Sequence, residues 1–232
     1  MSQKTTQADQ NWEKFHKEKL QHNFPRWPNE VMLKLAYGRY LENPMTIKEG
    51  MKVLDIGCGF GNNLLPFLES GCACYGTEVT EETAALAQRL AEERGYSCNI
   101  VHGYNQKLPY DDNTFDLLLS INVIHYEKTR EDIDASFQEY CRVLKDDGAM
   151  ILITVGPEHL IYKKAKPIGA HQFEIRDFDF RNGENYYYFD NTKYLGAHLE
   201  PYFSDIETGR VTESLMARPL DFLVAVARNK KA

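Results

Sequence analysis

The chain has 232 residues, of which 43% are hydrophobic and 26% are charged, and its formal net charge is -7. This length and composition predict one globular domain with a full core. The acidic balance disfavours nucleic acid as a partner, because non-specific binding requires a basic surface. No apolar run approaches the roughly 20 residues of a membrane span, so we expect no membrane partner.

The five cysteines are odd in number, include no CxxC pair and follow no secretory signal. Reduced thiols in a cytoplasmic protein are the simplest interpretation. The chain contains no H-E-x-x-H motif, and its histidines are not spaced like metal ligands. The sequence therefore predicts no metal site.

Residues 1–45 are predicted to form an N-terminal helical cap that precedes the main domain at 46–232. Residues 1–10 are polar and predict a loose tail, and aromatic and charged residues follow. Pro28 and Asn29 indicate the start of a helix. The aromatic side chains of this segment either cover a ligand or merely pack on the sheet.

The next segment reads as a strand, a glycine turn and a helix. The apolar run Val53–Ile56 predicts a buried strand, and Gly57, Gly59 and Gly61 follow at alternate positions. Glycines lack Cβ, so they adopt positive φ and let a ligand approach the backbone closely. The helix that follows points free N–H groups at that ligand. Such an arrangement begins a nucleotide-binding βαβ unit.

The glycine spacing discriminates between ligands. A dinucleotide fingerprint would place its third glycine at position 62, which is Asn62, and here Asp55 stands two residues before the first glycine. An acid at this place repels phosphate but can hold an ammonium group. Val53–Gly61 resembles the first motif of the class I S-adenosylmethionine-dependent methyltransferases of the small-molecule, methyltransferase-11-like type. An ordinary tight loop is the alternative.

The resemblance covers residues 50–155 and, more weakly, 190–230. It implies an α/β fold, a Rossmann-like three-layer sandwich whose seven-stranded, mostly parallel sheet has an antiparallel last strand. It implies S-adenosylmethionine as the cofactor and S-adenosylhomocysteine as its product. The predicted cofactor-binding residues are Asp55, Gly57, Cys58, Gly59, Gly61, Asn62, Glu78, Val79, Asn105, Gln106, Ile121 and Asn122.

Glu78 ends a second predicted strand, 72–77, and lies 21 positions after Gly57. A carboxylate at this spacing can accept hydrogen bonds from both ribose hydroxyls. The alternative is an acid that favours a helix N-terminus, a role that Glu81 and Glu82 already fill. A helix is predicted over 80–94 and a third strand over 97–102.

The loop after the third strand departs from the family pattern. Relatives usually carry an acid that meets the adenine amino group, and Tyr104 stands there instead. An amide oxygen of Asn105 or Gln106 could take over this contact, and Tyr104 could stack on the base. The alternative is a polar surface loop.

A fourth strand is predicted over 115–121. In an open α/β sheet, ligands bind outside the carboxyl ends of the strands. The resemblance places Ile121 and Asn122 beside the methionine part of the cofactor, and it places His125 and Tyr126 near the substrate as candidate catalytic residues. His125 either acts as a general base or packs and hydrogen-bonds without taking part in chemistry.

A helix is predicted over 129–145, where Thr129 and Asp132 resemble a capping box, and a fifth strand over 149–155. Residues 156–190 then follow neither a helical nor a strand period. Three lysines and one acid lie between Glu158 and His171. We interpret this segment as a substrate-recognition insert that faces an anion, with a solvated surface loop as the alternative. The predicted substrate-binding residues are Trp27, His159, Tyr162 and His171.

The chain ends with a predicted helix at 191–202 and strands at 204–211 and 219–227. The whole pattern predicts a methyltransferase, monomeric or homodimeric, that acts on an O, N or C nucleophile of a small and conceivably anionic metabolite. An NAD-dependent oxidoreductase on a similar sheet is one alternative, against which Asp55 and Asn62 count. A non-catalytic S-adenosylmethionine-binding protein is the other, because cofactor motifs do not prove turnover.

Overall fold

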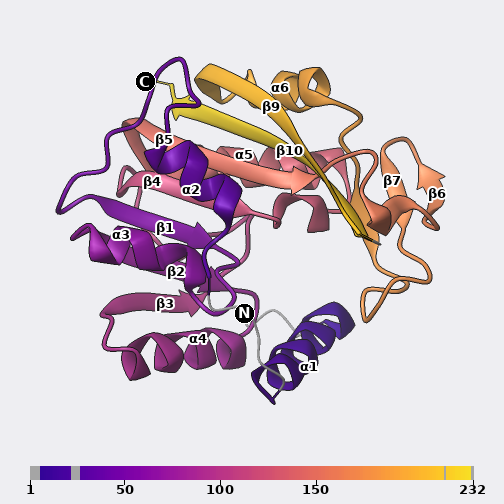
Figure 1. The fold of residues 1–232 in the computed structure, drawn as a ribbon, viewed down its shortest axis with the longest axis horizontal. Coiled ribbons are helices and arrows are strands. Elements are labelled where there is room, and N and C mark those ends of the chain that lie inside the picture. Colours follow the sequence, from indigo (N-terminus) through magenta and orange to yellow (C-terminus); the bar gives the residue numbers. More distant parts are fainter. Residues whose placement is uncertain (1–5, 22–26, 217, 231–232) are drawn as a thin grey trace.

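The computed structural model describes residues 6–21, 27–216 and 218–230. Its centre is a seven-stranded sheet in the order β3-β2-β1-β4-β5-β10-β9 (Figure 1). The first five strands are parallel, and β10 is antiparallel to both of its neighbours. The strands are β1 (Lys52–Ile56), β2 (Ala73–Glu78), β3 (Cys98–His102), β4 (Phe115–Ile121), β5 (Leu144–Val155), β9 (Phe203–Leu215) and β10 (Arg218–Asn229).

The central parallel strands β1, β4 and, from Gly148 onward, β5 are buried on both faces, as crossover helices require. In β4, Leu118 faces one hydrophobic cluster, whereas Leu117 and Leu119 face another, because alternate residues of a strand point to opposite sides. Helices α5 (Arg130–Val143) and α6 (Thr192–Leu199) cover the first cluster. Helices α2 (Glu30–Tyr37) and α3 (Leu65–Glu69) cover the second, and the predicted three-layer fold is confirmed.

The predicted helix starts are confirmed by their caps. Asn29, Thr80, Thr129 and Asn191 each accept a backbone N–H at the start of α2, α4 (Glu81–Glu93), α5 and α6. Thr129 and Asp132 form a complete capping box. Such caps stabilise a helix by about 0.5–2 kcal/mol each, which explains why these boundaries were readable from local sequence.

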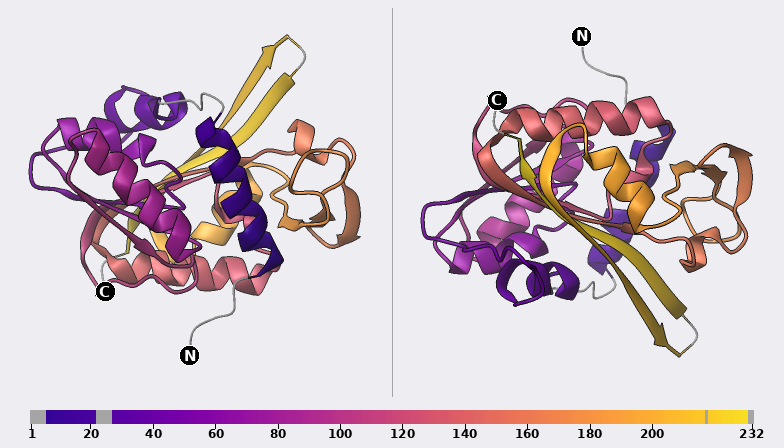
Figure 2. Two further views of the ribbon diagram at one scale, coloured as in Figure 1. Left: turned by 90° about the horizontal axis from the view of Figure 1, so that it is seen from below. Right: turned by 90° about the horizontal axis from the view of Figure 1, so that it is seen from above.

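The loose tail predicted for residues 1–10 is wrong from Gln7 onward, and residues 1–5 lie outside the described part. Helix α1 spans Gln7–Gln21 and crosses the carboxyl edge of the sheet (Figures 1 and 2). Its aromatic residues pack on tertiary partners far along the chain, so no local signal marked them as helical. Lys17 also pairs with Glu82 of α4 at 2.6 Å.

The prediction that residues 156–190 are irregular is wrong. They contain a second, antiparallel sheet of three strands. These strands are β6 (Lys166–Gly169), β7 (Gln172–Glu174) and β8 (Asn185–Tyr187), and a 3-10 helix, η3 (Leu160–Tyr162), precedes them. Strands of three or four residues are too short to show a period. The small sheet stands beside the carboxyl end of β5 (Figure 2).

Three strands of the main sheet also have boundaries that differ from the prediction. Strand β5 begins at Leu144, before the predicted end of the preceding helix, and the last two strands are longer than predicted. The hairpin of β9 and β10 extends beyond the body of the protein (Figure 2). In the part of the chain that the structure describes, no helix has the length and apolar character needed to cross a membrane.

Candidate active site

The strand order reverses between β1 and β4, and the ends of these two strands form the site. The turn after β1 holds Gly57, Gly59 and Gly61 at φ of 60°, 58° and 72°. A Cβ at Gly59 would meet no atom within 4 Å, whereas one at Gly57 would lie 2.9 Å from the Val123 side chain. The turn thus needs glycine for its conformation at all three positions, and it leaves open space beside Gly59.

Four buried polar oxygens around this turn have no hydrogen-bond partner in the described residues. They are both carboxylate oxygens of Asp55, the hydroxyl of Thr77 and the side-chain oxygen of Asn122. Asp55 and Thr77 are 1% exposed, and Asn122 adopts a positive φ of 60° at the end of β4. A buried polar group without a partner costs about 1–3 kcal/mol, so this concentration indicates a polar ligand.

Asp55 has an unusual electrostatic environment. Burial, followed by the nearby Glu78 carboxylate, raises the pKa of Asp55 well above its ordinary value, and the neighbouring Asn63 side chain only partly opposes this. A cation placed beside Asp55 would lower this pKa again, because it stabilises the charged carboxylate.

Glu78 ends β2 and accepts the Gly59 N–H at 2.5 Å. Burial raises its pKa to about 7, while the N–H groups of Gly59 and Val79 and the Thr83 side chain act in the opposite direction. The carboxylate therefore ties the end of β2 to the glycine turn. The sequence anticipated its place at this edge but not its bond to the turn.

The other predicted cofactor residues near the glycine turn make their contacts through backbone or side-chain groups. Cys58 is buried, and burial raises the pKa of its thiol. Its contact with β2 is made by the backbone, because its N–H donates to the carbonyl oxygen of Thr77. The Asn62 side chain accepts a hydrogen bond from Arg94 at 3.1 Å. Ile121 is buried at the end of β4.

Asn105 and Gln106 both point their amide groups at Glu127, which the sequence did not single out. Their NH₂ groups donate to the two Glu127 oxygens at 2.7 Å and 2.6 Å. Ser136 donates to Glu127 as well, at 3.3 Å. The loop after β3 is thus tied to the segment after β4, and each amide keeps its oxygen as an acceptor.

His125 and Tyr126 lie in the 3-10 helix η2 (Ile124–Tyr126), directly after β4. The His125 Nδ1 is 3.2 Å from the Thr154 hydroxyl, and its ring lies against those of Tyr126 and Tyr186. Burial, followed by the charges of Arg181 and His159, lowers the pKa of His125 well below its ordinary value. The imidazole is therefore neutral at neutral pH.

An aromatic wall, formed by Trp12, Phe15, Tyr126 and Phe180, joins α1 to this edge. The Trp12 ring lies 5.2 Å from that of Tyr126 and 5.0 Å from that of Phe180. Phe15 stacks on Phe180 at 4.2 Å. Among these residues, sequence patterns assigned a site role only to Tyr126, because the others meet it from distant parts of the chain.

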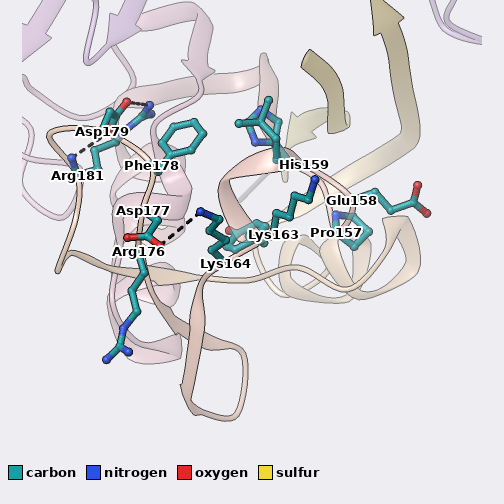
Figure 3. A pocket seen from close by; sticks show the side chains of 12 residues that line it. Pro157, Glu158, His159, Lys163, Lys164, Arg176, Asp177, Phe178, Asp179 and Arg181 are labelled. Atoms are coloured by element: carbon teal, nitrogen blue, oxygen red, sulfur yellow. Dashed lines mark hydrogen bonds and ion pairs between the residues drawn. The ribbon is translucent and has the colours of Figure 1, made fainter. Parts of the chain in front are cut away.

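The predicted substrate residues fall into three places. His159 and Tyr162 line a cleft of about 790 Å³ between 157–164 and 176–181 (Figure 3). His171 lies outside that cleft and stacks on Tyr194 at 4.3 Å. Trp27 is 81% exposed. No group of three or more potential metal ligands occurs in the described ranges.

Known proteins share both the sequence and the fold. A family model described as a methyltransferase domain matches residues 54–152. The methyltransferase-like ECU09_1500 protein of Encephalitozoon cuniculi is 32% identical over 184 residues, which cover 77% of this chain and 81% of that protein. The uncharacterized methyltransferase YcgJ of Bacillus subtilis is 32% identical over 103 residues, which cover 44% of this chain and 40% of YcgJ.

A solved S-adenosylmethionine-dependent methyltransferase from Methanosarcina mazei has the same fold, with a TM-score of 0.66 and 21% identity over 80% of this chain and 95% of that one. The glycine turn, the unpartnered oxygens at the strand ends and the extended match to a relative agree with one another. The chain therefore belongs to the class I methyltransferases, enzymes that take S-adenosylmethionine as their methyl donor.

Proposed function

We propose that this protein transfers a methyl group from S-adenosylmethionine to an O, N or C nucleophile of a small molecule. The observation that carries the proposal is the set of buried, unpartnered oxygens of Asp55, Thr77 and Asn122 around a glycine turn at the switch point of the sheet. Open α/β sheets bind ligands at this point.

The residues of the turn fit the parts of the cofactor. Asp55 would receive the amino group of its methionine part, since a cation is what this buried carboxylate lacks. Glu78 would accept the ribose hydroxyls, held in place by the Gly59 N–H. Asn122 and Ile121 would face the methionine part from the end of β4, and the Asn105 and Gln106 oxygens would serve the adenine.

When bound, S-adenosylmethionine supplies a methyl group on a positively charged sulfur, already activated for displacement. The protein's task is therefore alignment and exclusion of water. We assign His125 and Tyr126 to the acceptor side. His125 is neutral and is held by its contact with Thr154. Because its pKa is lowered, the imidazole is a weak base, which favours placement of the acceptor over general-base catalysis.

We further propose that residues 1–45 cover the bound ligands and that 156–190 recognise the acceptor. The aromatic wall supports this division, because Trp12 of the first segment meets Phe180 of the second at the edge of the sheet. The five free cysteines suit a reducing compartment such as the cytoplasm, and a small molecule remains the proposed partner of a monomer or homodimer.

Calorimetry with S-adenosylmethionine and with NADH tests the first half of the proposal. We expect saturable heat with the former and none with the latter. Production of S-adenosylhomocysteine from a pool of cell metabolites tests the second half. Binding without turnover on any fraction of the pool would favour a non-catalytic binding protein, and the absence of binding would reject the proposal as a whole.

A further inference from the structure

Glu127 is the point at which the loop after β3 meets the segment after β4. The NH₂ groups of Asn105 and Gln106 donate to its two carboxylate oxygens at 2.7 Å and 2.6 Å. Within the described ranges this carboxylate faces neutral groups, the two amides and the Ser136 hydroxyl, rather than a cation. The contact is therefore a hydrogen-bonded junction between two loops at the carboxyl edge of the sheet.

Glu127 is itself fixed by its backbone and by α5. Its N–H donates to the Ile124 carbonyl at 3.2 Å, and its own carbonyl accepts the Tyr187 N–H of β8 at 2.9 Å. The Ser136 hydroxyl of α5 lies 3.3 Å from one carboxylate oxygen. Burial raises the pKa of Glu127, whereas the hydrogen bonds from the two amides act in the opposite direction because they stabilise the charged form. The amides thus favour an ionised carboxylate at a fixed place.

An ionised carboxylate determines which end of each amide faces it. A carboxylate only accepts hydrogen bonds, whereas an amide has an NH₂ donor at one end and a carbonyl acceptor at the other. Glu127 therefore turns both NH₂ groups towards itself. The hydrogen bonds of Asn105 and Gln106 within the described residues run from nitrogen, so both oxygens remain available as acceptors. Residues 103–107 contain no acid, and the loop thus offers a ligand neutral acceptors.

The loop begins beside the proposed ribose position. Strand β3 pairs with β2 so that His102 lies opposite Glu78, and the Gly103 N–H donates to the Glu78 carbonyl at 2.9 Å. The strand order is β3-β2-β1-β4 in this part of the sheet. The proposed methionine contacts lie at the ends of β1 and β4 and the ribose contact at the end of β2. The base, attached to the far side of the ribose, would therefore reach the loop after β3.

We propose that Glu127 sets the selectivity of the cofactor site for adenine, because it holds the Asn105 and Gln106 amides with their oxygens as acceptors for the 6-amino group. This inference rests on the proposed methyltransferase function and adds the residue that specifies the base. The 6-amino group carries two N–H donors and so matches two acceptors. A base with a carbonyl oxygen at position 6 would set an acceptor against acceptors and leave the amide oxygens without a donor. Glu127 acts through the two amides and is thus a positioning residue.

Calorimetry of the full chain with S-adenosylhomocysteine and with S-inosylhomocysteine tests this inference. The second compound differs from the first only in the base, where a carbonyl oxygen at position 6 replaces the amino group. We expect the wild type to bind the adenine compound at least about tenfold more tightly, because the other base leaves acceptors unpaired. Equal binding of the two compounds would overturn this inference alone. Binding of neither compound would remove the methyltransferase proposal and this inference with it.

Glu127→Gln separates selectivity from a structural role. A glutamine presents one acceptor and one donor, so one of the two facing amides must turn its oxygen inwards and its NH₂ group towards the base. The ratio of the two affinities should fall at least about fivefold, the value of one hydrogen bond, whereas a structural defect would weaken both compounds equally. Glu131→Gln, which removes an exposed acid from the first turn of α5, should leave the ratio unchanged. An unchanged ratio in folded Glu127→Gln would overturn the proposal.

The double variant N105A/Q106A tests the same idea without changing Glu127. It should lose the preference for the adenine compound, and Glu127→Gln added to it should have no further effect on the ratio, because Glu127 acts only through these amides. Retained preference in N105A/Q106A, or a further fall on adding Glu127→Gln, would overturn the proposal. Thermal unfolding of each variant checks the fold, and N105A/Q106A decides the outcome if Glu127→Gln does not fold.

Discussion

The two halves of the proposed site are built by different means. The cofactor half, from β1 to α4, is a short stretch of chain whose backbone turn and buried carboxylates converge locally. The acceptor half joins α1 to η2 and the insert, which follow α1 by more than a hundred residues, and the three segments meet through rings. Local backbone geometry thus prepares one half, and side-chain packing between distant segments prepares the other.

This difference has a functional reason. Conformational requirements such as positive φ at Gly57, Gly59 and Gly61 define the cofactor half, because the turn must bring its backbone close to the ligand. The acceptor varies between enzymes, and loops positioned by a rigid sheet can change without disturbing it. The variants below are expected to affect one half while sparing the other.

The largest effect on turnover is expected for His125→Ala. Loss of the ring should misplace the acceptor and reduce turnover about 100-fold, the scale of a misalignment of about 1 Å. Cofactor affinity, measured by calorimetry, should not change, because the imidazole packs against Tyr186, on the side that we assign to the acceptor. Tyr126→Phe serves as the companion variant, since it retains the ring packing. Undiminished turnover in His125→Ala would remove the residue from the reaction.

Glu78→Ala should have the reverse pattern. Removal of a hydrogen bond to a charged group costs about 1.5–3 kcal/mol, so we expect cofactor affinity to fall by roughly 10- to 150-fold. Glu81→Ala, which removes an exposed acid of the same segment, is the matched control. Thermal unfolding of both variants checks that the turn still forms. An unchanged dissociation constant in a folded Glu78→Ala protein would exclude the ribose contact.

The pH dependence of stability should also separate the halves. The folded pKa of Glu78 is raised to about 7 from an ordinary value of 4.5, so the folded state binds this proton more tightly. The stability that it contributes is complete below pH 4.5 and is lost as pH rises through 7. The lowered pKa of His125 acts only below about 6.5, where it destabilises the folded state.

Urea unfolding of the ligand-free protein should therefore show a loss of about 1 kcal/mol between pH 6.5 and 8. Glu78→Gln should reduce this slope, because an amide does not titrate, and His125→Asn should not alter it. Part of the slope should persist, because burial also raises the pKa of Glu184 to about 7. An undiminished slope in Glu78→Gln would assign the whole effect to Glu184 or Asp55, whose pKa is raised by burial too.

The smallest effect is expected for Trp12→Ala. Each aromatic pair contributes about 0.5–1.5 kcal/mol beyond its buried area, and Trp12 pairs with Tyr126 and Phe180 across the edge of the sheet. Hydrogen exchange of the α1 amides should accelerate, while the amides of β1 and β4 keep their protection. Trp27→Ala, at an 81% exposed ring, should change neither. Equal exchange in wild type and Trp12→Ala would show that the wall does not hold α1.

Sequence patterns determined the parts of this protein whose cause is local. The strands β1 and β4 are short segments rich in apolar residues, the helices α4 and α5 carry their own caps and periods, and the glycine turn requires three residues without Cβ. The family motif then supplied the seven-stranded, mostly parallel sheet and the cofactor, but not the order of the strands. These features depend on neighbours within a few residues, which a single sequence displays.

Only the tertiary structure decided the rest. It paired Trp12 with Phe180, turned Asn105 and Gln106 towards Glu127, and packed His125 against Tyr186. It also made strands of the short segments in 166–187, because their backbone groups pair with one another rather than following a period. Contacts across more than a hundred positions leave no trace in local propensity, and burial in the folded chain sets the ionisation of Asp55, Glu78 and His125.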